Sequence, residues 1–100
     1  MMRRKRSDRN YVLYRLYIDG QEYIGLTVSI GRAFLRSVKV RVQKHMSRAK
    51  VENKDWTVCE ALRNADVIEY EVLEVIRGRR NAYQRERQLI AEYQPELNDF

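Results

Sequence analysis

The sequence has one cysteine, one proline and four glycines among its 100 residues. A single thiol, Cys59, excludes an internal disulfide and lacks the paired thiols of a zinc site. Because chain-breaking residues are scarce and 44% of the residues are hydrophobic, the composition excludes a disordered, low-complexity chain. No apolar run approaches the roughly 18 residues that span a bilayer, and no apolar signal core follows the basic start. These absences predict a soluble, cytoplasmic protein that depends on packing for its stability.

Acidic residues are scarce in the first half of the chain. Residues 1–50 contain thirteen Lys or Arg and three Asp or Glu, whereas residues 51–100 contain seven and eleven. Most basic residues of the first half are arginines, whose planar fork fits phosphate oxygens. The overall charge of +6 therefore predicts a polyanionic partner, with DNA favoured. An anionic membrane fits less well, because the basic cluster at residues 3–9 has no interleaved apolar residues.

The first half of the chain predicts a hairpin followed by two helices. Two runs of aromatic and branched residues, 11–18 and 22–26, flank Asp19-Gly20, which is typical of a type I′ turn. Apolar residues at spacings of three and four then predict a helix that Ser37 caps. Asp55 can cap a second helix.

The second half predicts a strand and a last helix. Residues 67–76 alternate between apolar and acidic side chains until the phase slips at Val72-Leu73, which indicates a β-bulge. Asn81 can cap a last helix that ends before Pro95. The buried face of this helix is expected to carry Ala82, Glu86, Leu89, Ile90 and Tyr93. The predicted fold is α+β, a small three-stranded antiparallel sheet flanked by helices in the order ββααβα.

Glu86 is the first candidate for chemistry, because an acidic residue on a buried helix face needs a cation or a role. One carboxylate can hold a hydrated Mg²⁺, since this ion keeps several of its waters. The alternative is a surface ion pair with a neighbouring arginine, which could be Arg79, Arg80, Arg85 or Arg87. Taken alone, Tyr14 has a structural explanation, because tyrosine is common in half-buried hairpins. His45 is likewise explained as a solvated side chain on a basic helix.

The order of elements and several short motifs resemble the GIY-YIG nuclease family, whose name comes from two strand motifs. The family also carries a helical arginine followed four residues later by a histidine, then a glutamate and an asparagine on and after the last helix. The matching positions here are Val12-Leu13-Tyr14, Tyr23-Ile24-Gly25, Arg41, His45, Glu86 and Asn98.

The resemblance is incomplete at two places. The first motif has Val12 and Leu13 where the family has glycine and isoleucine. The stretch before Arg41 is also longer than is common in the family, so Arg32 or Arg36 could take its place.

The resemblance implies a divalent-metal-dependent endonuclease that hydrolyses DNA, with Mg²⁺ or Mn²⁺ held by Glu86. It assigns the general base to Tyr14, and arginine neighbours together with the metal are expected to favour its phenolate. Tyr23 would position this hydroxyl or the attacking water. Arg41 would bind the scissile phosphate, and His45 would assist as a polar or proton-transferring group.

Two further matched residues would support the site. Gly25 would let the chain approach a phosphate or the next helix, and Asn98 would orient the site from the C-terminal end. A flexible basic arm, residues 1–10, is expected to precede the nuclease-like domain, residues 11–100. The side chains expected to bind nucleic acid are Arg3, Arg4, Lys5, Arg6, Arg9, Lys44 and Arg48.

A non-catalytic module that binds nucleic acid through the same scaffold is the alternative function, because a fold alone does not confer activity. A homodimer or a larger complex stays open at this point.

Overall fold

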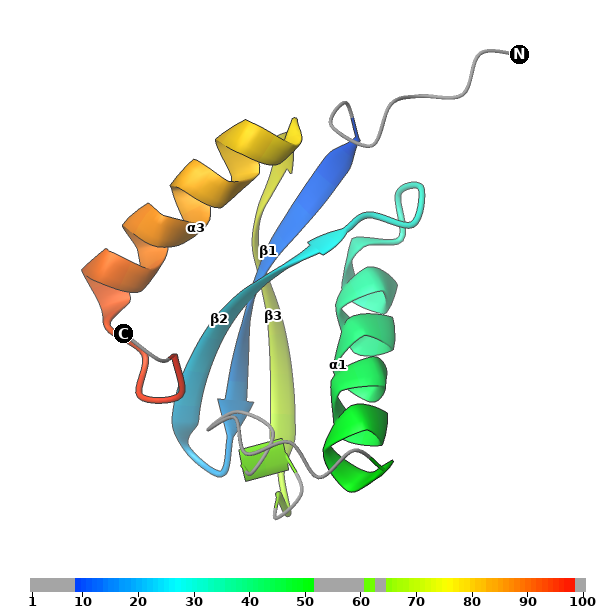
Figure 1. Ribbon diagram of the computed structural model, residues 1–100, viewed down its shortest axis with the longest axis vertical. Helices are drawn as coiled ribbons and strands as arrows, with labels where there is room; N and C mark the ends of the chain where they lie inside the picture. Colours follow the sequence, from blue (N-terminus) through cyan, green and yellow to red (C-terminus); the bar gives the residue numbers. More distant parts are fainter. Residues whose placement is uncertain (1–8, 52–60, 63–64, 99–100) are drawn as a thin grey trace.

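The computed structural model describes residues 9–51, 61–62 and 65–98, excepting the side chains of residues 45–51. Its three-stranded antiparallel sheet has the order β2-β1-β3 and is accompanied by two long helices (Figure 1). The elements are β1 (Asn10–Ile18), β2 (Gln21–Val28), α1 (Phe34–Val51), β3 (Ile68–Arg77) and α3 (Arg79–Tyr93). The predicted fold class is confirmed. The helix predicted after Asp55 falls largely outside the described residues, although residues 61–62 are helical.

The predicted hairpin joins β1 and β2 through the two-residue turn Asp19-Gly20. Both turn residues have positive φ, 49° and 84°, as a type I′ turn requires. This turn sets the register that places Tyr14 opposite Gly25. The Asp19 carboxylate also accepts hydrogen bonds from the backbone of Asp66 and Val67, which fixes the entry to β3.

The bulge indicated by the sequence is present in β3. Leu13 pairs with Glu74 while the next residue of β1, Tyr14, pairs with Val72, so Leu73 is the extra residue. Val72 packs toward one face of the sheet and Leu73 toward the other. The bulge therefore lets consecutive apolar residues of β3 contribute to two different cores.

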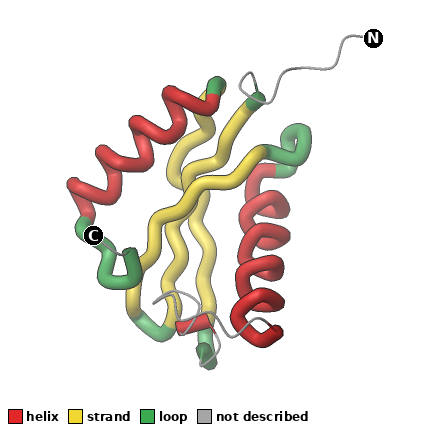
Figure 2. Tube along the Cα trace, viewed as in Figure 1, coloured by secondary structure: helices red, strands yellow, loops and turns green. Residues whose placement is uncertain are grey.

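Alternate residues of β1 are buried on opposite faces, because β1 is the central strand and a helix covers each face (Figure 2). The face toward α1 carries the larger core, made of Val12, Tyr14, Leu16, Ile18, Val38, Val42, Leu62 and Leu97. The face toward α3 carries a smaller core of Leu13, Ile24 and Leu89. Tyr14 thus belongs to the sheet face that α1 covers.

Two of the three predicted helix caps, Ser37 and Asn81, are wrong, and the third, Asp55, lies outside the described residues. Helix α1 begins at Phe34, and Ser37 lies within its first turn. The Ser37 hydroxyl donates to the Ala33 carbonyl at 2.7 Å and accepts from the Ile30 amide at 2.8 Å, so it fastens the preceding loop onto the helix. Helix α3 begins at Arg79, two residues before the predicted cap Asn81.

The predicted buried face of α3 is correct at Ala82 and Leu89 and wrong at Tyr93, which is exposed. Tyr93 ends the helix, where its ring lies 5.2 Å from the guanidinium carbon of Arg15. Leu35, which its spacing of three from Val38 places in the predicted apolar stripe of α1, is exposed as well.

The domain begins slightly earlier than predicted. Asn10 is the first residue of β1 and pairs with Arg77, and the Arg9 carbonyl accepts a hydrogen bond from the Gly78 amide at 3.0 Å. Residues 1–8 of the predicted arm lie outside the described residues. Among the helices that the structure describes, none combines the length and apolar character needed to cross a lipid bilayer.

Candidate active site

Tyr14 is at the centre of the candidate site, with a side chain only 1% exposed. Its ring lies directly over Gly25 on the neighbouring strand: a β-carbon built on Gly25 would be 2.5 Å from both Cζ and the hydroxyl oxygen of Tyr14. The Tyr23 ring lies on the same side, with its centroid 6.4 Å from that of Tyr14. The two strand motifs therefore form one contact surface in which a glycine makes room for a tyrosine.

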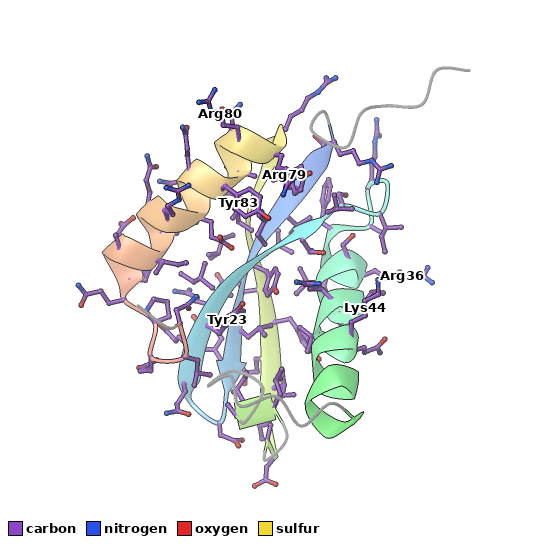
Figure 3. All side chains as sticks on the ribbon, viewed as in Figure 1. Tyr23, Arg36, Lys44, Arg79, Arg80 and Tyr83 are labelled. Atoms are coloured by element: carbon purple, nitrogen blue, oxygen red, sulfur yellow. The ribbon has the colours of Figure 1, made fainter. Side chains whose placement is uncertain are left out.

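Arg41 reaches this surface from α1. Its guanidinium lies close enough to the Tyr14 phenol to lower the pKa of that phenol. Its Nε is buried and has no hydrogen-bond partner in the described part of the chain. Arg32 and Arg36, the competing candidates, are both exposed, and Figure 3 shows Arg36 on the outer side of α1. Of the three arginines, Arg41 is the one that lies near Tyr14.

The pKa of the Tyr14 phenol is raised above its ordinary value of about 10. Burial is the main cause, and Tyr23 and Glu86 raise the pKa further. Arg41 lowers the pKa through its positive charge. Arg41 therefore acts in the expected direction, and in the protein alone burial outweighs its effect. In the protein alone, Tyr14 carries its proton at neutral pH.

Glu86 approaches Tyr14 from α3, on the other side of the sheet, closely enough for its charge to raise the pKa of the phenol. The side chain is half-buried, and burial raises the pKa of its carboxyl while Arg87 opposes the shift. The carboxylate makes no hydrogen bond or ion pair with any side chain that the structure describes. The neighbouring Arg85 pairs instead with Glu74, at 2.6 Å.

A groove of about 370 Å³, here called the Arg41 groove, has Arg41 in its lining, whereas Tyr14 and Glu86 do not line it. Three basic side chains and no acidic one line it. The lining residues come from β1, β2, α1, α3 and the loop before α1 and are Tyr11, Leu26, Thr27, Val28, Ile30, Ser37, Val40, Arg41, Lys44, Arg79 and Tyr83. An anionic ligand would meet positive charge on several sides here.

Sequence reasoning missed the contribution of Arg79 and Tyr83 to this groove. The sequence pattern indicates Arg79 only as one of several possible ion-pair partners of Glu86. Its spacing of four residues from Tyr83, on the first turns of a helix, was the signal that could have found the pair. In the structure the guanidinium carbon of Arg79 lies 5.5 Å from the centroid of the Tyr83 ring.

Asn98 holds β2 in place. Its side-chain oxygen accepts from the Ile24 amide and its side-chain nitrogen donates to the Ile24 carbonyl, both at 2.9 Å. The amide of Leu97 donates to the Glu22 carbonyl at 3.0 Å. The segment after α3 therefore pairs with the outer edge of β2 and fixes the backbone between Tyr23 and Gly25.

The described residues contain no cluster of three or more His, Cys, Asp or Glu side chains that could enclose a metal ion. A site built on Glu86 would suit a hydrated Mg²⁺ or Mn²⁺, because Mg²⁺ keeps several waters and needs one or two carboxylates. The His45 side chain, one turn beyond Arg41 in α1, lies outside the described residues, as does that of Arg48.

Of the remaining residues predicted to bind nucleic acid, two have side chains that the structure describes and four do not. Lys44 is exposed and lines the Arg41 groove, and Arg9 lines a shallow groove with Asn10, Ser29 and Gly31. The other predicted contacts lie outside the described residues and are Arg3, Arg4, Lys5 and Arg6.

The site thus combines a buried tyrosine, an arginine and a half-buried carboxylate from three elements. Comparisons of the chain with protein-family models, curated proteins and solved structures found no match. The functional interpretation therefore depends on the chemistry of the residues themselves, and the resemblance to GIY-YIG nucleases stays a hypothesis.

Proposed function

We propose that this protein is a divalent-metal-dependent endonuclease of GIY-YIG type that hydrolyses phosphodiester bonds of DNA. One observation carries the proposal. Around the Tyr14 hydroxyl, the Nε donor of Arg41 and the carboxylate of Glu86 both lack partners in the described part of the chain. A buried donor without an acceptor and a half-buried carboxylate without a hydrogen-bonded partner are each costly. A phosphate group accompanied by a divalent cation would satisfy both.

Hydrolysis of a phosphodiester adds water to phosphorus and breaks the bond to the leaving oxygen, so negative charge grows on the phosphate oxygens. The guanidinium of Arg41 would bind these oxygens and stabilise that charge. Glu86 would hold Mg²⁺ or Mn²⁺, which when bound supplies Lewis-acid stabilisation of the same charge.

Tyr14 would accept the proton of the attacking water. Because its pKa is raised, it must first lose its own proton, so the active fraction of the protein should grow with pH. Tyr23, Gly25 and Asn98 would keep the phenol in position, through ring packing, close approach and the hydrogen bonds to β2. His45 is proposed to assist in proton transfer, as the resemblance implies.

Incubation with supercoiled plasmid, with and without Mg²⁺, tests the proposal. The wild-type protein should nick the plasmid with Mg²⁺ and leave it intact with EDTA. Glu86→Gln should remove cleavage without loss of DNA affinity. Glu74→Gln is the matched control, because Glu74 has an arginine partner and lies outside the site. Cleavage by Glu86→Gln at the wild-type rate would contradict the assignment.

A non-catalytic nucleic-acid-binding module is the second candidate, and the raised pKa of Tyr14 favours it. A phenol that keeps its proton could serve only to hold a phosphate through hydrogen bonds. DNA binding by the wild-type protein with no cleavage across pH 7 to 10 would support this function. The proposal also includes the soluble, cytoplasmic location expected from the sequence.

A further inference from the structure

The first turns of α3 carry a second groove, here called the α3 groove, of about 540 Å³. It is lined by Arg79, Arg80, Tyr83, Gln84 and Arg87. Tyr83 is 40% exposed, so its ring is accessible to a ligand. Arg79 lies against this ring, with its guanidinium carbon 5.5 Å from the ring centroid. The groove therefore combines positive charge with an accessible aromatic surface.

The arginines of the α3 groove are available to a ligand. Arg79, Arg80 and Arg87 form no ion pair or hydrogen bond within the described residues, and no acidic side chain lines the groove. Arg85, on the same helix, differs because it pairs with Glu74 at 2.6 Å and contacts Gln88 at 3.2 Å. The fold thus neutralises Arg85 internally, places the charge of Arg87 near Glu86, and leaves Arg79 and Arg80 in the groove without an acidic partner among the described residues.

The two grooves are continuous, because Arg79 and Tyr83 line both of them. Figure 3 shows these two side chains on the part of α3 nearest the sheet. Arg80, at the same end of the helix, lies on the side away from the sheet. A strand whose phosphate lies beside Arg41 would therefore extend over Tyr83 and along the α3 arginines.

We propose that the α3 groove binds an unpaired segment of nucleic acid next to the scissile phosphate. The arginines would contact its phosphates and one of its bases would stack on Tyr83. A paired base inside a duplex already has neighbours on both faces, so it cannot stack on a protein ring without unpairing. The groove therefore favours a substrate in which a single-stranded segment adjoins the cleavage site. This inference rests on the proposed function for its substrate, but the binding itself does not require cleavage.

The test is fluorescence anisotropy in EDTA, which prevents metal-dependent cleavage. The probes are a labelled oligothymidylate of about 12 nucleotides, the oligouridylate of equal length, and a blunt duplex. Tyr83→Ala should weaken binding of both single strands about tenfold and of the duplex less than about twofold, because stacking needs a free base. Tyr83→Phe should restore single-strand binding, because its ring keeps the stacking surface. A loss confined to the RNA or the DNA strand identifies which of the two the groove takes.

Arg80→Ala provides a second measurement that does not depend on the ring. It should lower the slope of log affinity against log salt by about 0.7 for single strands. Arg85→Ala is the matched control and should leave both affinity and slope unchanged, because Glu74 already neutralises it.

The outcomes separate this inference from the proposed nuclease. Dependence of single-strand binding on Tyr83, together with an intact plasmid, would support the groove while the proposed cleavage fails. Plasmid cleavage together with wild-type single-strand binding by Tyr83→Ala would overturn the groove and leave the nuclease standing. Equal losses on single strands and duplex would also overturn it, because they would show that the ring supports the fold and does not stack on a base.

Discussion

The Tyr14 ring covers the α-carbon of Gly25 so closely that a β-carbon there would be 2.5 Å from two of its atoms. The two residues are direct cross-strand partners, so the two strand motifs meet in a single contact. This contact decides where the Tyr14 hydroxyl lies relative to Arg41 and Glu86. It also gives Gly25 a steric role that does not depend on any positive φ.

Gly25→Ala should therefore destabilise the protein. The added methyl group forces the buried Tyr14 ring to move, and overpacking of this kind costs about 1 to 3 kcal/mol. Urea denaturation measures the loss. In a Tyr14→Leu background, which removes the ring, the same substitution should cost much less. An equal cost in both backgrounds would contradict the steric explanation.

Tyr14→Phe should lower the cleavage rate by about 10² to 10⁴ and flatten its dependence on pH. Because the pKa of Tyr14 is raised, the phenolate is scarce at pH 7, and the wild-type rate should rise about tenfold per pH unit over the alkaline range. Single-turnover rates between pH 7 and 10 provide the measurement. Tyr17→Phe is the control, because Tyr17 lies on the opposite face of β1, and a similar loss there would exclude Tyr14 as the particular base.

Glu86→Gln should stabilise the fold while it removes activity. The raised pKa of Glu86 means that the folded protein favours the neutral carboxyl. The stability that this carboxyl contributes is fully present below its ordinary pKa, and it is lost as the pH rises through the raised pKa of the folded state. At pH 7 the ionised Glu86 carboxylate therefore lowers the stability of the fold, and a neutral Gln side chain removes this cost. The Tm of Glu86→Gln at pH 7 should therefore exceed that of the wild-type protein.

Metal binding can be followed by the same thermal measurement. Mg²⁺ should raise the Tm of the wild-type protein and leave that of Glu86→Gln unchanged, because a bound ligand stabilises the native state. Glu74→Gln, which breaks an exposed ion pair, should keep the Mg²⁺ shift and gain no stability. A lower Tm for Glu86→Gln at pH 7 would indicate that the carboxylate has a structural partner.

Arg41→Ala should lower kcat by about 10² to 10³ with a smaller rise in KM, because charge on the phosphate oxygens grows toward the transition state. Arg41→Lys should fall between wild type and Arg41→Ala, because an ammonium supplies the charge without the planar fork. Arg36→Ala is the matched control on the same helix and should change KM alone. If Arg36→Ala abolishes turnover and Arg41→Ala does not, the assignment of the phosphate-binding arginine is wrong.

Local patterns in the sequence determined the sheet. Asp19-Gly20 specified the hairpin because both residues accept positive φ, and the phase slip at Val72-Leu73 marked the bulge because side chains of a strand alternate. The same alternation placed Tyr14 and Tyr17 on opposite faces. These features depend on neighbours within a few positions along the chain, which a sequence displays directly.

Only the tertiary structure decided the electrostatics and the membership of the site. The pKa of Tyr14 is raised because its side chain is buried. Of the three candidate arginines, Arg41, which the spacing in the sequence favours, lies near Tyr14, whereas Arg32 and Arg36 are exposed. Tyr83 enters the groove because α3 begins at Arg79, earlier than its apparent cap indicated. Burial and contact between distant elements depend on how helices pack on both faces of the sheet, and spacing along the chain does not encode that arrangement.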